Sequence, residues 1–337
     1  MNWSFWIPML VLTAAPVTLL MADRILGVPA AKVIRYLGPP GLVAYATLIV
    51  YGAVQGHEVV TLLAWGALGG FLATIALDIV RLVGLRLGLF PMDMPMMFGL
   101  IALGYAPRLQ RNMIGRLVEE LSTLPEEERS RMMAARLPAM SRLDPAKRRA
   151  VVGAMMAGLG RLPEESRRQV MATQMQVLTQ LPEETRLILM RTMDEAAQGV
   201  DEFPYSQPRG LPKIPMATFR RLASRAFPDT LKETGTSRTK VALWGYTWHF
   251  LIGMSFGIMY TMFAGDGTWG LAFAWGTFVW LAMMVAMPPM MPSIRFPKWF
   301  PLWPLLAHLV MALPIGAVAL AWVSRADANA ASLFRHF

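Results

Sequence analysis

The sequence LPEEER at Leu124–Arg129 returns as LPEESR at Leu162–Arg167 and as LPEETR at Leu181–Arg186. A related motif, LDPAKRR, occupies Leu143–Arg149 between the first two copies. Successive prolines are 18 to 20 residues apart, which is the length of one short helix and its connecting turn. Proline suits the first turn of a helix, and glutamates suit the positive end of the helix dipole. The repeats therefore predict four short helices.

Each repeat contains the pattern Pro-x-x-x-Arg, and we expect its arginine to pair back onto the acids of its own helix. The four pairs are Pro125/Arg129, Pro145/Arg149, Pro163/Arg167 and Pro182/Arg186. No helix of this length buries an apolar stripe alone, so we expect the four to stack antiparallel around one core. The predicted core positions are Met133, Leu137, Met140, Val152, Met155, Met156, Leu159, Met171, Met175, Leu178, Met190 and Met193.

The rest of the 337-residue chain is too apolar for an ordinary soluble protein, because 55% of all residues are hydrophobic and the mean hydropathy is +0.42. Most charged residues lie between Arg108 and Lys240. The chain has no cysteine, which excludes disulfides, thiolate metal sites and cysteine nucleophiles. Basic loops on one side of a membrane account for the net charge of +10, so no nucleic-acid partner is expected.

Apolar runs predict about six membrane spans and an all-α, multi-pass bundle, into which the short-helix repeat domain is inserted. A seventh run, Pro95–Ala106, is too short to span and predicts a re-entrant or interfacial helix. The predicted spans are Phe5–Ala22, Gly41–Val54, Val59–Val80, Val241–Phe263, Trp269–Met287 and Leu302–Val323.

Basic residues predict the orientation of these spans. They follow the first span, follow the third and separate the fifth from the sixth, whereas the opposite loops carry no lysine or arginine. All basic regions share one side if the N-terminus is outside. We therefore expect a bacterial inner-membrane protein with a cytoplasmic repeat domain. The basic residues are Arg24, Lys32, Arg35, Arg81, Arg86, Arg295 and Lys298.

The predicted domains are an N-terminal membrane part at 1–106, the repeat domain at 107–198, a linker region at 199–240, a C-terminal membrane part at 241–323 and an outer tail at 324–337. Within the linker region, Met216–Phe227 is basic and amphipathic. Arg220, Arg221 and Arg225 alternate there with Phe219, Leu222 and Phe227. This pattern predicts a helix that lies on the membrane surface.

The Leu-Pro-Glu-Glu-x-Arg repeats, over about Leu124–Ala197, resemble the cytosolic N-domain of MgtE-type magnesium channels. That resemblance implies a superhelix of short helical hairpins. In those channels the repeats precede the membrane part, whereas here they interrupt it, so we carry over the shape and not the transport.

A second resemblance covers the membrane part. Gly69–Thr74 with Phe90–Pro95, then His249-Phe250-x-x-Gly253-x-x-x-Gly257, then His308, is similar to a group of small uncharacterised bacterial multi-pass inner-membrane proteins. The resemblance implies helices with glycine-rich faces and brings no activity with it.

Four residues in or beside the spans are candidates for chemistry. Asp78 and Asp93 are transport candidates, since ionisable residues inside a membrane commonly serve function. An ion pair between Asp78 and Arg81 is the structural alternative. His249 and His308 are candidate ligands of haem, chlorophyll or copper. The alternative is that each histidine makes a hydrogen bond between helices.

Glycine and methionine patterns complete the candidate residues. Gly66/Gly70, Gly84/Gly88 and Gly253/Gly257 follow the Gly-x-x-x-Gly pattern of closely packed membrane helices, within the chain or with a neighbouring subunit. Two methionine clusters, Met92–Met97 and Met283–Met291, are compatible with copper, but methionine is equally frequent in the repeats, which favours a packing role.

No catalytic motif is present, which favours a protein other than an enzyme. We carry three hypotheses. The first is a non-catalytic accessory or assembly subunit of a larger membrane complex, such as a bioenergetic one, with other membrane subunits and lipid as partners. The second is a transporter or channel for a metal ion or small solute. The third is a haem-, chlorophyll- or copper-binding oxidoreductase subunit. No cofactor is predicted, whereas bound lipid is expected.

Overall fold

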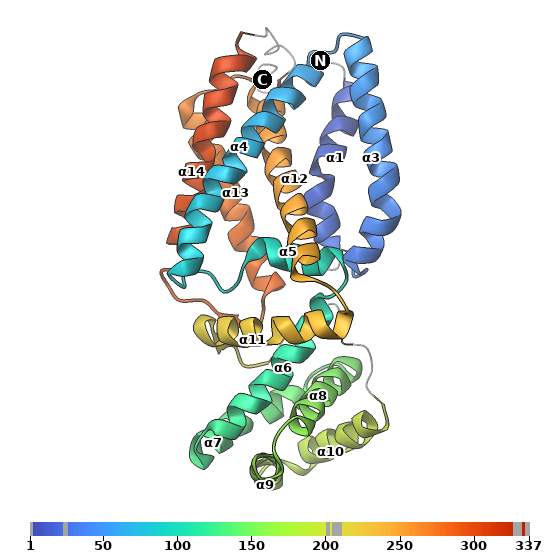
Figure 1. Cartoon of the computed structure of the whole chain (residues 1–337), viewed down its shortest axis with the longest axis vertical. Helices are drawn as coiled ribbons and strands as arrows, with labels where there is room; N and C mark the ends of the chain where they lie inside the picture. The colour runs from blue at the N-terminus through green and yellow to red at the C-terminus, as the bar shows by residue number, and fades with distance from the viewer. Residues whose placement is uncertain (1–2, 23–25, 200–202, 204–210, 326–331, 334–337) are drawn as a thin grey trace. The chain divides into compact units, whose positions relative to one another are not determined.

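The computed structural model describes residues 3–22, 26–199, 203, 211–325 and 332–333. Most of the predicted linker and of the predicted outer tail therefore lies outside the described residues. The chain divides into two compact units. Unit 1 contains Met1–Gly104, Arg238–Pro289 and Lys298–Phe337, and unit 2 contains Tyr105–Ser237 and Met290–Pro297. Both are built almost wholly from helices (Figure 1).

Five helices of unit 1 are long and apolar enough to cross a membrane. They are α1 (Trp3–Leu20), α3 (Ala30–Val54), α4 (Val59–Arg86), α13 (Trp269–Met290) and α14 (Leu302–Val318), which a π-helical turn, η1 (Ala319–Val323), extends. The second span is longer than the predicted Gly41–Val54 because its helix continues through Pro39 and Pro40.

The fourth predicted span, Val241–Phe263, forms helix α12 (Arg238–Ala264), which is 27 residues long but is not among the five apolar candidates. Its tryptophan, tyrosine, glycine and histidine residues lower its mean hydropathy. Helix α12 packs against α4, α5 and α1. The predicted interfacial helix is α5 (Met94–Ala102), whose nine residues are too few to span.

Glycines bring α4 and α12 into backbone contact. A methyl group added to Gly70 would overlap the backbone of Gly253, and one added to Gly66 would overlap the backbone of Ile258. Gly66/Gly70 and Gly253/Gly257 therefore pack on each other within unit 1. Gly88 is different: it follows the end of α4 with φ of 75°, in the left-handed conformation that stops a helix. The predicted packing role of Gly88 was wrong.

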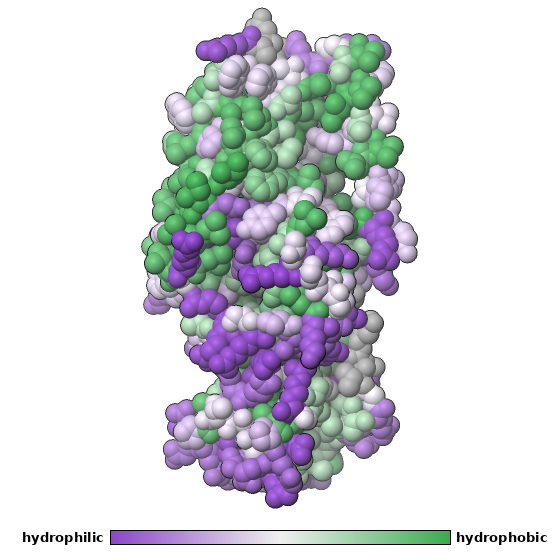
Figure 2. All heavy atoms as spheres, in the orientation of Figure 1, coloured by the Kyte–Doolittle hydropathy of each residue, from purple (hydrophilic) through white to green (hydrophobic). Residues whose placement is uncertain are grey.

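The outer helices of unit 1 expose apolar side chains. Only 6% of the residues in the apolar segment of α3 are buried within the protein, against 44% for α4. Figure 2 shows apolar residues along these helices on the face in view. Such faces need a hydrocarbon environment or a protein neighbour.

Among the described residues, unit 2 contains six helices. Helices α6–α10 contribute side chains to one hydrophobic core. The four repeat helices begin directly after, or at, the repeated prolines. In the unit, α11 packs against α6, and a two-residue strand β1 (Ile214–Pro215) pairs in parallel with β2 (Ile294–Arg295). The helices are α6 (Ala106–Thr123), α7 (Glu126–Ser141), α8 (Pro145–Gly160), α9 (Glu164–Thr179), α10 (Glu183–Gln198) and α11 (Met216–Thr234).

Two of the four repeat arginines contact a different helix, which corrects for them the expectation that they pair within their own helix: Arg129 of α7 reaches α9, and Arg149 of α8 pairs with Glu195 of α10. Arg129 is buried, and its Nε donates to Thr173 Oγ1 of α9 at 2.8 Å. In the same way Arg148 Nε donates to Thr192 Oγ1 of α10 at 2.8 Å. In the second repeat Asp144 caps the helix where the other repeats have proline, so Arg148, and not Arg149, is the counterpart of Arg129.

The predicted core of unit 2 was wrong at three methionines. Met171 and Met175 of α9 and Met190 of α10 are about half exposed. Helix α9 instead buries Val170, Thr173, Gln174, Val177 and Leu178. The reason is that Arg129 holds Thr173 inward, which turns the methionine stripe toward solvent.

Candidate functional site

A cluster of ionisable side chains lies in unit 1, where α4 and α12 meet the start of α5. We call it the Asp78 cluster, and it comprises Asp78, Arg81, Asp93, Tyr246 and His249. Asp78 and Arg81 lie one turn apart on α4, and Tyr246 and His249 one turn apart on α12. Asp93 precedes α5. The glycine contact between α4 and α12 makes the approach of these side chains possible, because it removes the side chains that would hold the helices apart.

Arg81 is the centre of the Asp78 cluster. Its Nε donates to Asp78 Oδ1 at 2.7 Å, its Nη1 to Asp93 Oδ1 at 2.7 Å and its Nη2 to Tyr246 OH at 3.2 Å. The arginine is 3% exposed, so an unpaired guanidinium here would be costly. Both the expected ion pair with Asp78 and a second one with Asp93 are therefore present.

His249 connects the two helices. Its Nε2 lies 2.8 Å from Asp78 Oδ1, the same oxygen that accepts from Arg81. Because an ionised carboxylate only accepts hydrogen bonds, the Nε2 of His249 carries a proton. With neutral His249 the cluster holds two carboxylates and one guanidinium, and with protonated His249 its charges balance.

The second membrane histidine lies outside the Asp78 cluster. His308 of α14 is buried, and its Nδ1 is 2.7 Å from the carbonyl oxygen of Pro304 in its own helix. Within the described part of the chain, no group of three or more histidine or acidic side chains is arranged to hold a metal ion. His249 and His308 belong to separate hydrogen-bond networks.

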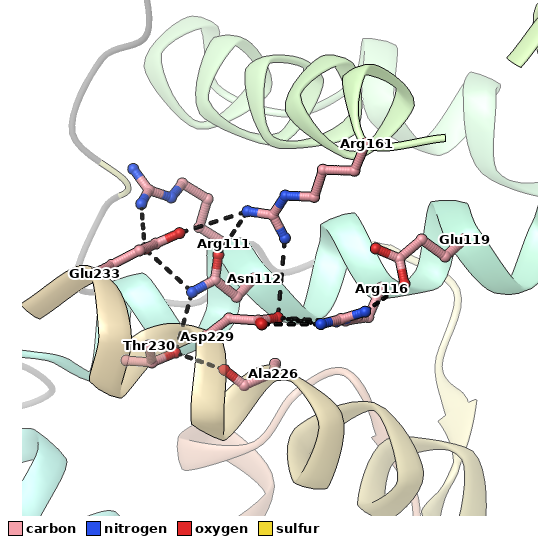
Figure 3. Close-up of polar contacts among 9 residues, drawn as sticks. All are labelled: Arg111, Asn112, Arg116, Glu119, Arg161, Ala226, Asp229, Thr230 and Glu233. Atoms are coloured by element: carbon pink, nitrogen blue, oxygen red, sulfur yellow. Dashed lines mark hydrogen bonds and ion pairs between the residues drawn. The ribbon is translucent and has the colours of Figure 1, made fainter. Parts of the chain in front are cut away.

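A second charged cluster lies in unit 2 (Figure 3). We call it the α6–α11 cluster. Arg116 of α6 makes a two-pronged contact with Asp229 of α11, at 2.8 Å from both Nε and Nη2. Arg111 donates to Glu233 at 2.6 Å, and buried Asn112 donates to Thr230 at 3.1 Å. Figure 3 also shows Arg161, after α8, reaching the same carboxylates.

The α6–α11 cluster changes the interpretation of the amphipathic segment. The apolar face of α11 is buried within unit 2, where Phe219 is 3% and Leu222 1% exposed. Arg221 pairs with Glu120 of α6. Sequence analysis placed this apolar face against lipid, and that placement was wrong, because α6 offers both an apolar surface and matching charges.

A third feature is an apolar surface on α9 and α10. We define the α9–α10 apolar surface as Met171, Met175, Leu187 and Met190, each 47% to 57% exposed. The two helices are in contact, since Gln174 Nε2 lies 3.6 Å from Met193 Sδ.

This surface borders a small apolar pocket whose enclosed volume is about 20 Å³. Met171 and Met190 each lie one turn before a residue that lines the pocket, Gln174 and Met193 respectively. Flexible methionine side chains around a pocket are suited to receiving apolar side chains of another protein.

The comparisons with known proteins give no identity. No family model, no curated protein and no solved structure matches this chain.

Sequence analysis singled out Asp78, Asp93 and His249 separately, and the structure brings them together. It missed Tyr246, although its place three residues before His249 puts it on the same helix face. It also gave no sign that Asn112 and the carboxylates of α11 meet, because they are more than 100 residues apart in the chain.

Proposed function

We propose that the protein is a non-catalytic accessory or assembly subunit of a larger membrane complex, and that unit 2 is its docking module. In this proposal unit 2 is cytoplasmic, the N-terminus is outside, and the complex lies in a bacterial inner membrane, with bioenergetic complexes as the first class to examine. The observation that carries the proposal is the α9–α10 apolar surface.

Among the described residues of unit 2, these four are the large apolar side chains that are exposed, and they lie on two neighbouring short helices. An amphipathic helix, which places apolar anchors at helical spacing, is the kind of partner that suits an exposed apolar surface of this type. The partner is therefore a protein segment with a leucine- or phenylalanine-rich helix face.

The test uses extraction of the full chain in mild detergent from its native membrane, followed by a native gel and mass spectrometry of co-migrating chains. Wild-type protein is expected in a large assembly with fixed partners. The variant Met171→Gln/Met175→Gln/Leu187→Gln/Met190→Gln is expected to reach the membrane but to migrate without them.

A matched control keeps the experiment specific. Gln176→Ala/Arg191→Ala changes exposed polar residues of the same two helices and should leave the assembly intact. The proposal is abandoned if wild-type protein migrates as a monomer or homo-oligomer, or if the methionine variant keeps every partner. A visible spectrum of the same gel band tests for the haem, chlorophyll or copper of the third hypothesis.

The Asp78 cluster favours a second candidate, a transporter of a cation or proton. Its support is the contact of His249 on α12 with Asp78 on α4, a helix that is long and apolar enough to cross a membrane. Uptake of a metal ion or of protons by vesicles containing the purified protein is the direct assay. An Asp78→Asn/Asp93→Asn variant that is folded and transports as well as wild type would rule this candidate out.

A further inference from the structure

A groove in unit 2, lined by α6, α7 and α11, has open space of about 600 Å³. That volume includes solvent in front of the groove, and the enclosed part is about 90 Å³. The walls are apolar and include three parts of the unit: Met113, Ile114 and Leu117 of α6, Phe219 and Leu222 of α11, and Phe203. Most of these side chains are buried or half-buried, so the groove extends below the surface of unit 2.

Two polar side chains in the groove have unmet interactions. Gln110 Oε1 is buried and accepts no hydrogen bond. Arg136 of α7 also lines the groove, and no carboxylate among the described residues pairs with it. Arg116, Arg148 and Arg161 of unit 2, by contrast, each have a side-chain partner. Burial without a counter-charge lowers the pKa of the Arg136 guanidinium.

A half-buried cation without a partner destabilises a protein unless an anion comes to it. The guanidinium binds carboxylates with two parallel hydrogen bonds. A half-turn of the Gln110 amide would present its NH2 group to the same space, and that group donates to a carboxylate. The apolar walls require the rest of the ligand to be a hydrocarbon chain, for which each buried methylene contributes about 0.8 kcal/mol.

We propose that this groove binds a long-chain fatty acid, with the carboxylate on Arg136 and Gln110 and the acyl chain along α6 and α11. The binding site is independent of the α9–α10 apolar surface. A negative result for fatty-acid binding therefore does not bear on the docking proposal. It gives unit 2 a lipid ligand outside the membrane-spanning helices.

The test uses the full chain in nanodiscs of phosphatidylcholine, a lipid without net charge. A palmitate with a diazirine in its chain is the probe, and crosslinked peptides are mapped by mass spectrometry after illumination. Crosslinks to peptides of α6, α7 or α11 are expected. Unlabelled palmitate should compete for them, whereas hexadecanol, which has the same chain and no charge, should not.

Arg136→Gln is expected to reduce crosslinking about tenfold, the effect of one lost charge-assisted hydrogen bond pair in a partly exposed site. Arg131→Gln, at an exposed arginine of the same helix, should leave it unchanged. Arg136→Lys keeps the charge and should retain most crosslinking. Equal crosslinking of the Arg136→Gln and Arg131→Gln variants, effective competition by hexadecanol, or no crosslink to these helices in wild type would each overturn the proposal.

Ile114→Trp provides a second variant in case Arg136→Gln fails to fold. It fills the groove without touching the charge and should abolish crosslinking. A folded Ile114→Trp variant, shown by an unchanged circular dichroism spectrum, that still crosslinks at the wild-type level would contradict the site.

Discussion

At the scale of single residues, buried arginines organise both units. Arg81 gathers two carboxylates and a tyrosine in unit 1, and Arg129 fixes Thr173 in unit 2. In each case a planar group with several donors satisfies partners on different segments of the chain. These arginines are therefore structural centres, and the groups around them are the places to look for exchangeable protons.

Asp78→Asn should destabilise unit 1 more than Asp93→Asn. Asp78 serves both Arg81 and His249 and is 12% exposed at its side chain, whereas Asp93 serves Arg81 alone and is 34% exposed. Loss of a buried partner costs about 3–5 kcal/mol, and we expect the lower end because Asp93 still faces Arg81. Thermal unfolding in detergent, followed by tryptophan fluorescence, measures the difference. Equal midpoints for the two variants would show that Asp78 is not the main partner.

At the scale of helices, the contact of α4 with α12 depends on the absence of side chains. Gly70→Ala should lower stability by about 1–3 kcal/mol, since its methyl group overlaps the backbone of Gly253. Gly41→Ala is the control, because a methyl group on Gly41 of α3 meets nothing within 4 Å. That change should be neutral or stabilising. The thermal unfolding midpoints of both variants in the same detergent test this prediction. An equal drop in midpoint for Gly41→Ala and Gly70→Ala would contradict the close approach of α4 and α12.

The attachment of α11 to α6 gives a second prediction at this scale. Asp229→Asn removes the partner of the Arg116 fork and should weaken the attachment by about 1 kcal/mol, a modest value because both side chains are partly exposed. Hydrogen exchange of the α11 amides should become severalfold faster. Asp194→Asn, at an exposed residue of α10, should leave α11 unchanged. Unaltered exchange in the Asp229→Asn variant would mean that the apolar face alone holds α11.

The sequence predicted where helices form more accurately than it predicted which face of each helix is buried. The repeat helices follow from proline spacing and the membrane helices from apolar runs, and both signals are local. Which face of α9 is buried depends on Arg129, 44 residues away, whose hydrogen bond places Thr173 inside and Met175 outside. Likewise, the charges of α11 resemble those of a membrane-surface helix until their partners on α6 are known. Long-range partners cannot be read from one helix alone.

At the scale of the whole molecule, orientation is the main prediction. The chain has no cysteine, so a single introduced cysteine reports its own position without background. If the proposed orientation holds, a membrane-impermeant maleimide should label the Gln55→Cys variant in intact cells, because that orientation puts its loop outside, and should not label Arg142→Cys, in unit 2. After lysis both should react, since both residues are exposed. Labelling of the Arg142→Cys variant in intact cells would reverse the proposed orientation.

The pairing of β1 with β2 has a consequence for biosynthesis. The partner strand Ile294–Arg295 leaves the ribosome roughly 80 residues after Ile214–Pro215, at about 5–20 residues per second. For several seconds, while α12 and α13 are being made, unit 2 has its helices but lacks its final strand. A chaperone or insertion machinery that binds the incomplete unit 2 must act within that interval. A ribosome stalled between the two strands would hold unit 2 in this incomplete form.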